Sequence, residues 1–110
     1  MTDPLRNREI VRELISSLGP TLVATLSGSR DRALPLRWAK DGGPEPDSDA
    51  ARRLVFAHRQ WVLLAAAEGV DVARQWFIGG NPLLQEETPL TAIREDRHSD
   101  VAEAVRAFLV

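Results

Sequence analysis

The chain has no cysteine among its 110 residues. This absence excludes disulfide bonds, thiolate catalysis and cysteine-ligated zinc sites, and it fits a reducing cytoplasm. No apolar run approaches the roughly 18 residues that a membrane-spanning helix needs. Residues 1–6 are polar and lack the apolar core of a signal peptide, so we expect a cytoplasmic protein with no membrane partner.

Motifs for catalysis are also missing. The chain has no P-loop, no GxGxxG and no serine motif with a partner base. The two histidines lie far apart without further ligands at metal spacing; we expect His58 in the core and His98 on the surface. The acidic pairs 86–87 and 95–96 indicate a solvated loop, or the acidic edge of an interface that attracts a basic partner. We therefore predict no enzyme, no catalytic or metal-binding residues, no cofactor and no small-molecule substrate.

The composition is that of a globular protein, with 44% hydrophobic residues and a net charge of −2. This length suits one compact domain or two small subdomains that share a core. Residues 1–40 carry seven basic and four acidic side chains, whereas residues 41–110 carry seven basic and twelve acidic ones. The asymmetry indicates either a weakly basic N-terminal surface or a chance scatter of charges.

Apolar periodicity predicts a helix over residues 4–18, capped by Asp3 and ended by Gly19. Its apolar stripe recurs at i, i+3, i+4 and i+7 and consists of Val11, Leu14, Ile15 and Leu18. The apolar residues 21–26 could form a strand by pattern alone, but their helical flanks favour a two-turn helix.

Residues 27–29 form a turn, and Pro35 then requires the next helix to begin close to it. That helix is expected to run through Trp38 to Lys40. Residues 41–49 are rich in glycine, proline and aspartate, which predicts a loop.

The longest helix is predicted over residues 50–68, with Ser48 or Asp49 as its cap and Gly69 at its end. Its expected buried stripe consists of Ala51, Leu54, Val55, His58, Trp61, Val62 and Ala65.

Three shorter helices complete the chain. They are predicted over residues 70–77, from Thr88-Pro89 to Ile93, and from a Ser99 cap to the C-terminal end. In the first of them, Val72 and Trp76 are expected to share an inward stripe. The prediction is an all-α fold of six or seven helices, with an N-terminal region over residues 1–47 and a C-terminal one over residues 48–110.

A Gly-Gly-Asn-Pro turn directly follows Trp76, Phe77 and Ile78, and a Pro-Leu helix start comes soon after it. The segment 72–109 resembles the C-terminal toxin-binding domain of the Xre/MbcA/ParS antitoxin family. The matching positions are Trp76 and Phe77, Asn81 and Pro82, Leu84, Pro89 and Leu90, and the final amphipathic helix 101–109. The family usually has glycine after the leucine, where this chain has Gln85 and Glu86, and it commonly has proline where this chain has Gly80.

The upstream part is similar to the Xre-like helix-turn-helix that often precedes this domain. Residues 21–26 would be the first helix, residues 27–29 the turn, and the stretch ending at residues 37–40 the recognition element. Pro35 departs from that pattern because it shortens the helix that would enter the major groove.

The resemblance implies an antitoxin of a type II toxin–antitoxin system, which blocks the active site of a RES-domain toxin that destroys NAD. It also implies a homodimer and repression of its own operon through operator DNA. The implied toxin-binding residues are Trp76, Phe77, Asn81, Pro82, Leu84, Phe108 and Leu109, and the implied DNA-binding residues are Arg30, Arg32, Arg37 and Lys40.

Three alternatives stay open. The aromatic residues could fill the protein's own core, and the basic residues could be a solvated face on which Arg32 pairs with Asp31 or another acidic neighbour. The chain could also be a stand-alone dimeric DNA-binding regulator, or a structural adaptor with neither partner.

Overall fold

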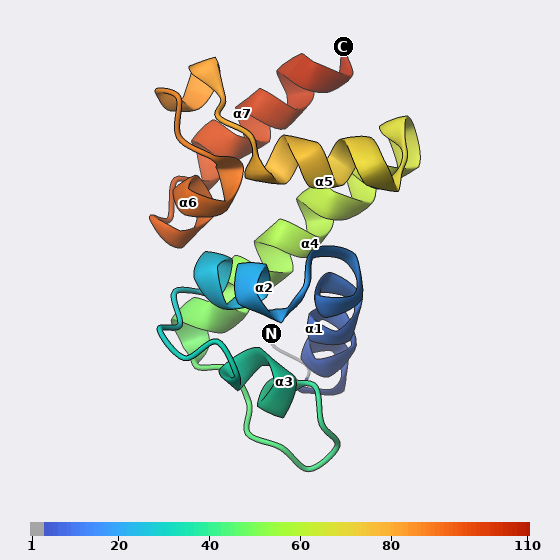
Figure 1. The fold of residues 1–110 in the computed structure, drawn as a ribbon, viewed down its shortest axis with the longest axis vertical. Coiled ribbons are helices and arrows are strands. Elements are labelled where there is room, and N and C mark those ends of the chain that lie inside the picture. Colours follow the sequence, from blue (N-terminus) through green and yellow to red (C-terminus); the bar gives the residue numbers. More distant parts are fainter. Residues whose placement is uncertain (1–3) are drawn as a thin grey trace.

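The computed structural model describes residues 4–110, with side chains from Arg6 onward (Figure 1). Within that range the chain forms seven α-helices and one 3₁₀ helix, which confirms the predicted all-α class. The elements are α1 (Pro4–Leu18), α2 (Pro20–Ser27), α3 (Leu34–Trp38), α4 (Ser48–Glu68), α5 (Val70–Ile78), η1 (Pro82–Leu84), α6 (Pro89–Arg94) and α7 (His98–Leu109). The expected cap Asp3 lies outside the described residues.

Local signals end several helices where the sequence predicts. Gly19 separates α1 from α2 with a φ of 88°, and Gly69 separates α4 from α5 with a φ of 92°. Only glycine adopts such angles without steric cost, so each glycine permits the sharp change of helix direction. The Thr88 side chain caps α6 by accepting a hydrogen bond from the N–H of Thr91 at 3.1 Å.

Two predicted caps are wrong. Asp47, not Ser48 or Asp49, caps α4, because its carboxylate accepts a hydrogen bond from the N–H of Ala50 at 2.9 Å. Ser99 lies inside α7, which begins at His98 without a side-chain cap. Asp47 lies one residue before Ser48, whereas the N-cap position of α7 is Arg97, two residues before Ser99.

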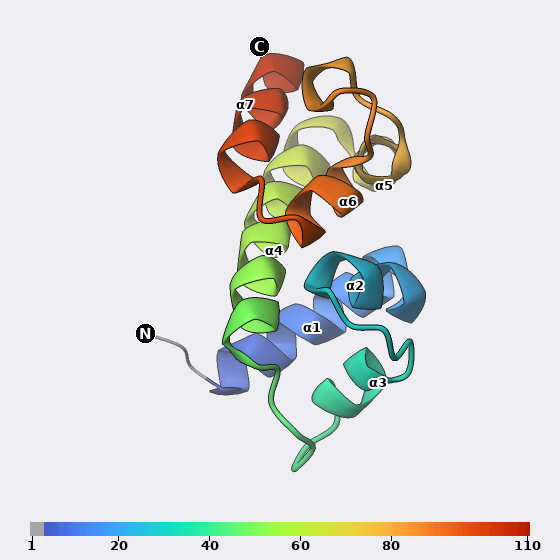
Figure 2. The same ribbon diagram turned by 90° about the vertical axis from the view of Figure 1, so that its left-hand side faces the viewer.

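The fold is organised around α4, which runs through the molecule from the α1–α3 end to the α5–α7 end (Figures 1 and 2). Helices α1 and α2 pack against α4, as do α5, α6 and α7, and α2 also packs directly on α6. A single hydrophobic cluster therefore joins the two regions, from Ile10 in α1 to Val105 in α7. The predicted boundary between the N-terminal and C-terminal regions, at residues 47 and 48, therefore does not separate two hydrophobic cores.

The buried faces of α4 and α5 are shifted from the expected stripes. In α4, Ala57 and Leu64 are fully buried, whereas Val62 is exposed. In α5, Val72 is exposed and the inward positions are Ala73 and Phe77. Neighbouring helices cover α4 on more than one side, so a single stripe at helical period does not describe its burial.

Candidate protein-docking surface

The Gly-Gly-Asn-Pro turn folds into a closed loop that one residue holds together. The N–H of Asn81 donates to the carbonyl of Glu87 at 3.1 Å, and its carbonyl accepts from the N–H groups of Leu84 and Glu86 at 2.8 and 2.9 Å. The Asn81 side chain caps η1 by accepting from the N–H of Leu83 at 2.9 Å. Four hydrogen bonds to one residue fix the backbone of the loop.

Backbone conformation adds to this constraint. Gln85 and Glu86 have φ angles of 56° and 68°, in the left-handed region that glycine favours. A Cβ atom on Gly80 would lie 2.9 Å from the carbonyl oxygen of Glu86, so the loop requires glycine at that position. Both residues that follow Leu84, where the resemblance predicts a glycine, therefore carry backbone strain.

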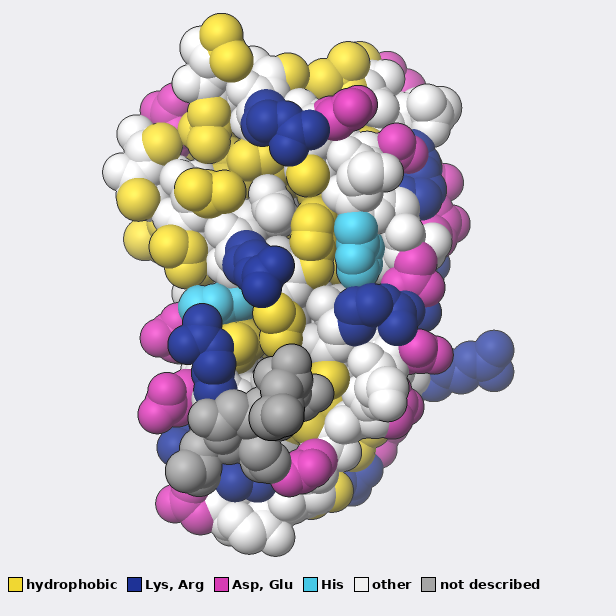
Figure 3. Space-filling model, turned by 180° about the vertical axis from the view of Figure 1, so that it is seen from behind, with side chains coloured by type: hydrophobic (Ala, Val, Ile, Leu, Met, Phe, Trp, Pro, Cys, Tyr) yellow, Lys and Arg dark blue, Asp and Glu magenta, His cyan; other side chains and the backbone are white. Residues whose placement is uncertain are grey.

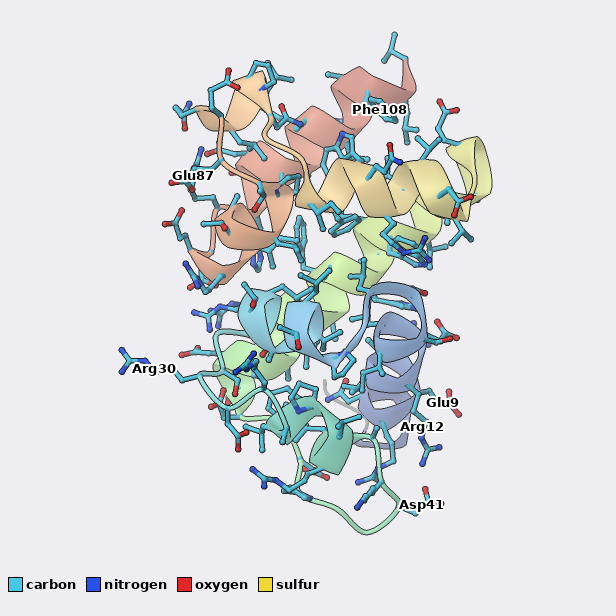
Figure 4. All side chains as sticks on the ribbon, in the orientation of Figure 1. Glu9, Arg12, Arg30, Asp41, Glu87 and Phe108 are labelled. Atoms are coloured by element: carbon cyan, nitrogen blue, oxygen red, sulfur yellow. The ribbon has the colours of Figure 1, made fainter. Side chains whose placement is uncertain are left out.

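This loop presents apolar side chains to solvent. Leu83, in η1, is 58% exposed, and Ile78, at the end of α5, is 46% exposed. Helix α7 packs against η1. Its last turn carries the exposed Phe108, which lies at the upper end of α7 near α5 (Figure 4). We call Ile78, Leu83 and Phe108 the loop surface.

Aromatic packing connects Phe108 of the loop surface to the core. Trp76 is half-buried and lies between Phe77 and Phe108, with ring centroids 5.6 and 6.3 Å away. Phe77 and Leu84 have no exposed surface, so in this fold they are not available to a partner, and any role in binding is through packing. Asn81 shapes the loop, Pro82 is exposed, and Leu109 packs on the core.

Exposed large apolar side chains concentrate in the C-terminal half. Among the residues whose side chains the structure describes, Leu36 is the only one before residue 60. The others are Val62, Leu63, Val70, Val72, Ile78, Leu83, Phe108 and Val110. A concentration of this kind is typical of a protein–protein interaction surface.

The predicted acidic loop is an ion-pair network centred on Arg97. The guanidinium of Arg97 lies 3.2 Å from Asp100, 3.5 Å from Glu87 and 3.9 Å from Glu95. A hydrogen bond between the carboxyl groups of Glu87 and Glu95 raises the pKa of Glu87, and burial raises it further. This network holds the start of α6 to the start of α7.

Next to it, Asp96 joins α4 to the α6–α7 corner. Hydrogen bonds from Arg53 and Arg52 of α4 hold the pKa of Asp96 well below its usual range. Asp96 has a φ of 62°, a left-handed conformation that aspartate tolerates better than most residues. His98 stacks on Phe56 with ring centroids 4.2 Å apart, and burial lowers its pKa. The expected surface position of His98 is therefore wrong.

The other histidine also differs from expectation. His58 is half-buried at the edge of α4, where its Nε2 atom lies beside the carboxylate of Glu13 of α1. Among residues 4–110, no group of three or more His, Cys, Asp or Glu side chains could hold a metal ion. Within the same residues, no helix is long and apolar enough to cross a membrane.

The geometry does not confirm a helix-turn-helix. Residues 28–33 separate α2 from α3, a longer turn than the three or four residues of that motif, and α3 has only five residues. Pro35 is buried in the first turn of α3, and the helix ends at Trp38 rather than at the expected Lys40. Arginines of α1 hold this end: Arg12 donates to the carbonyl of Ala39 at 2.7 Å.

The four predicted DNA-binding side chains are all exposed, but they are not equivalent. Arg37, rather than the expected Arg32, pairs with Asp31 across the turn. The N–H of Ala33 lowers the pKa of Asp31 most, and the pair with Arg37 lowers it further. Arg30 extends into solvent (Figure 4).

Sequence reasoning missed the most exposed members of the surface. Ile78 and Leu83 lie between the matching positions of the motif, and both are large apolar residues next to a tight turn. A second missed signal is the run of seven apolar residues from Trp61 to Ala67. A run of that length gives a helix an apolar side in every direction, including the side that faces solvent.

No protein-family model, curated protein or solved structure matches the chain. The relationship to the antitoxin family therefore stays a resemblance carried by residues 72–109. The loop surface stands on its own geometry: exposed apolar side chains at a loop whose backbone is fixed by hydrogen bonds.

Proposed function

We propose that the protein is an antitoxin, which binds a partner toxin through its C-terminal half and blocks the toxin's active site. The observation that carries the proposal is the loop surface, where Leu83 exposes an apolar side chain on a backbone fixed by Asn81 and Ile78 exposes another at the end of α5. Because the loop is already ordered, binding costs little conformational entropy, which favours a tight complex.

The class of toxin follows from the sequence pattern. Residues 72–109 resemble the toxin-binding domain of antitoxins whose partners have a RES domain and destroy NAD. On this proposal the protein covers the toxin's active-site cleft and has no catalytic role of its own. It acts in the cytoplasm. Homodimer formation and repression of the operon belong to the same proposal, with Arg30, Arg32, Arg37 and Lys40 as its DNA-binding residues.

The test is co-purification with a RES-domain toxin encoded beside this chain, followed by an assay of NAD consumption by that toxin. A stable complex with suppressed NAD loss supports the proposal. If no complex forms and NAD loss continues, the antitoxin role is refuted. Salt-dependent binding to operator DNA would then support the rival function of a stand-alone dimeric regulator.

A matched pair of variants tests the surface itself. Ile78 and Leu36 have the same exposed fraction, 46%, but Leu36 lies on α3 in the N-terminal half. We expect Ile78→Asp and Leu83→Asp to weaken suppression of the toxin by about tenfold or more each, because interface anchors carry most of the binding free energy. Leu36→Asp should leave it unchanged. Equal losses in all three variants would contradict the assignment of the loop surface.

A second pair separates toxin binding from DNA binding. Arg37→Ala combined with Lys40→Ala should leave toxin suppression intact and weaken operator binding, because phosphate contacts supply most of the affinity for DNA. Loss of both activities in this variant would refute a model with two independent surfaces.

A further inference from the structure

Residues 61–67 of α4 are apolar on every side of the helix. Trp61 and Leu64 face the core, whereas Val62 and Leu63 are 48% and 52% exposed. A soluble helix that is apolar all round is ordinarily covered on all sides. The outward side of this part of α4 has no covering element among residues 4–110.

Next to that side, α4 and α7 enclose a groove. Its volume is about 390 Å³, and its walls are Leu63 and Gln60 of α4, Ala102, Val105, Arg106 and Leu109 of α7, and the terminal Val110. Apolar side chains gather over this end of the molecule in the view from behind (Figure 3). We call this feature the α4–α7 groove. It is separate from the loop surface, because Phe108 turns toward Trp76 of α5 whereas Leu109 lines the groove.

Two basic side chains lie at or beside the groove. Arg106 is the only charged side chain in its walls, and Arg59 lies one turn before Leu63 on the same side of α4. Within the described part of the chain, neither arginine has a carboxylate oxygen within 4.0 Å. An apolar floor with unpaired guanidinium groups complements a ligand that is apolar on one side and acidic at its edge.

We propose that the α4–α7 groove binds an amphipathic helix of a partner protein. The apolar side chains of that helix contact Leu63 and Leu109, and its Asp or Glu side chains pair with Arg106 and Arg59. A groove between two helices accepts a third helix that lays its apolar face into it. A second copy of this chain fits less well, since twofold pairing places the same basic groove against itself. The proposal does not depend on the antitoxin function.

The probe is a labelled synthetic peptide of about 14 residues, close to the length of α7. It has leucine at i, i+3, i+4 and i+7 and glutamate beside them, and a control peptide replaces every glutamate with lysine. Fluorescence anisotropy with the full chain measures both affinities. We expect the acidic peptide to bind at least about tenfold more tightly than the lysine peptide.

Variants then assign the binding to the groove. Arg59→Glu combined with Arg106→Glu should reverse the order of the two peptides, and Leu63→Asp should weaken both by about tenfold or more. Val72→Asp changes an exposed apolar residue of α5 that lies outside the groove, so it should leave both affinities unchanged. Circular dichroism on each variant checks that the helices are retained.

Three results would overturn the proposal. The first is equal affinity for the two peptides, and the second is wild-type affinity in the folded Leu63→Asp variant. The third is sedimentation of the chain as a dimer that the Leu63→Asp substitution dissociates. That result would show that a second copy of the chain occupies the groove. Toxin suppression is measured separately on Ile78 and Leu83 variants, so failure of either proposal leaves the other standing.

Discussion

Glu86 offers the sharpest test of the loop geometry, because its backbone has a φ of 68°. We expect Glu86→Gly to make the protein more stable, although glycine usually destabilises a folded chain. The side chain of Glu86 is exposed, and the ion pairs of this corner run from Arg97 to Glu87 and Glu95 instead. Removal of the Glu86 side chain therefore tests almost only the effect of the backbone conformation at this residue.

The expected magnitude follows from two opposing contributions. A residue with a Cβ atom costs roughly 1–2 kcal/mol in the left-handed conformation, and glycine avoids that cost. Glycine also has more freedom in the unfolded chain, which lowers stability by about 0.5–1 kcal/mol. The free energy of unfolding should rise by up to about 1.5 kcal/mol. At Gln85 the gain should be smaller, because its side chain accepts a hydrogen bond from Arg97.

Urea unfolding followed by tryptophan fluorescence measures the change. The matched control is Glu103→Gly, the same substitution at an exposed position inside α7. There glycine should lower the free energy of unfolding by about 1 kcal/mol, because it disfavours a helix. The two variants should therefore differ in sign, with midpoints of thermal unfolding that move in opposite directions by about 4 °C.

A loss of stability in Glu86→Gly equal to that in Glu103→Gly would refute the left-handed conformation of the loop. Glu86→Asn provides a second measurement, because asparagine tolerates that conformation better than glutamate and carries no carboxylate. If asparagine and glycine both stabilise the protein, backbone conformation is the cause.

Three further predictions concern the fold around the two surfaces. Trp38→Ala should lower the free energy of unfolding by about 3–5 kcal/mol, since Trp38 is 4% exposed; a near-neutral urea curve would contradict its burial. Asn81→Ala should cost about 1 kcal/mol through the lost cap of η1, whereas Asn81→Asp keeps the acceptor and most of the stability, as thermal unfolding can show. The lowered pKa of Asp96 stabilises the fold above the pKa of the unfolded chain, and this contribution is lost as the pH falls below about 4. Asp96→Asn should therefore be less stable than the wild type at neutral pH and lose less stability on acidification; parallel pH profiles would contradict the ion pairs with Arg52 and Arg53.

Local sequence signals determined the helices of this protein. Proline at a first helical turn, glycine between helices and apolar spacing act within a few residues, so they predict the all-α class and most helix positions without reference to the rest of the chain. Gly19 and Gly69 are examples, because each both ends one helix and precedes the next. The Asn81-Pro82 turn is another, since the cap of η1 forms between adjacent residues.

Only the tertiary structure decided which apolar residues face solvent. Trp61, Val62, Leu63 and Leu64 are equally apolar in the sequence, and the placement of α1, α5 and α7 around α4 buries the first and last while it exposes the middle two. The pairing of Arg52 and Arg53 with Asp96 likewise joins positions more than 40 residues apart. Such contacts depend on how whole helices pack, and a periodicity within one helix carries no information about its neighbours.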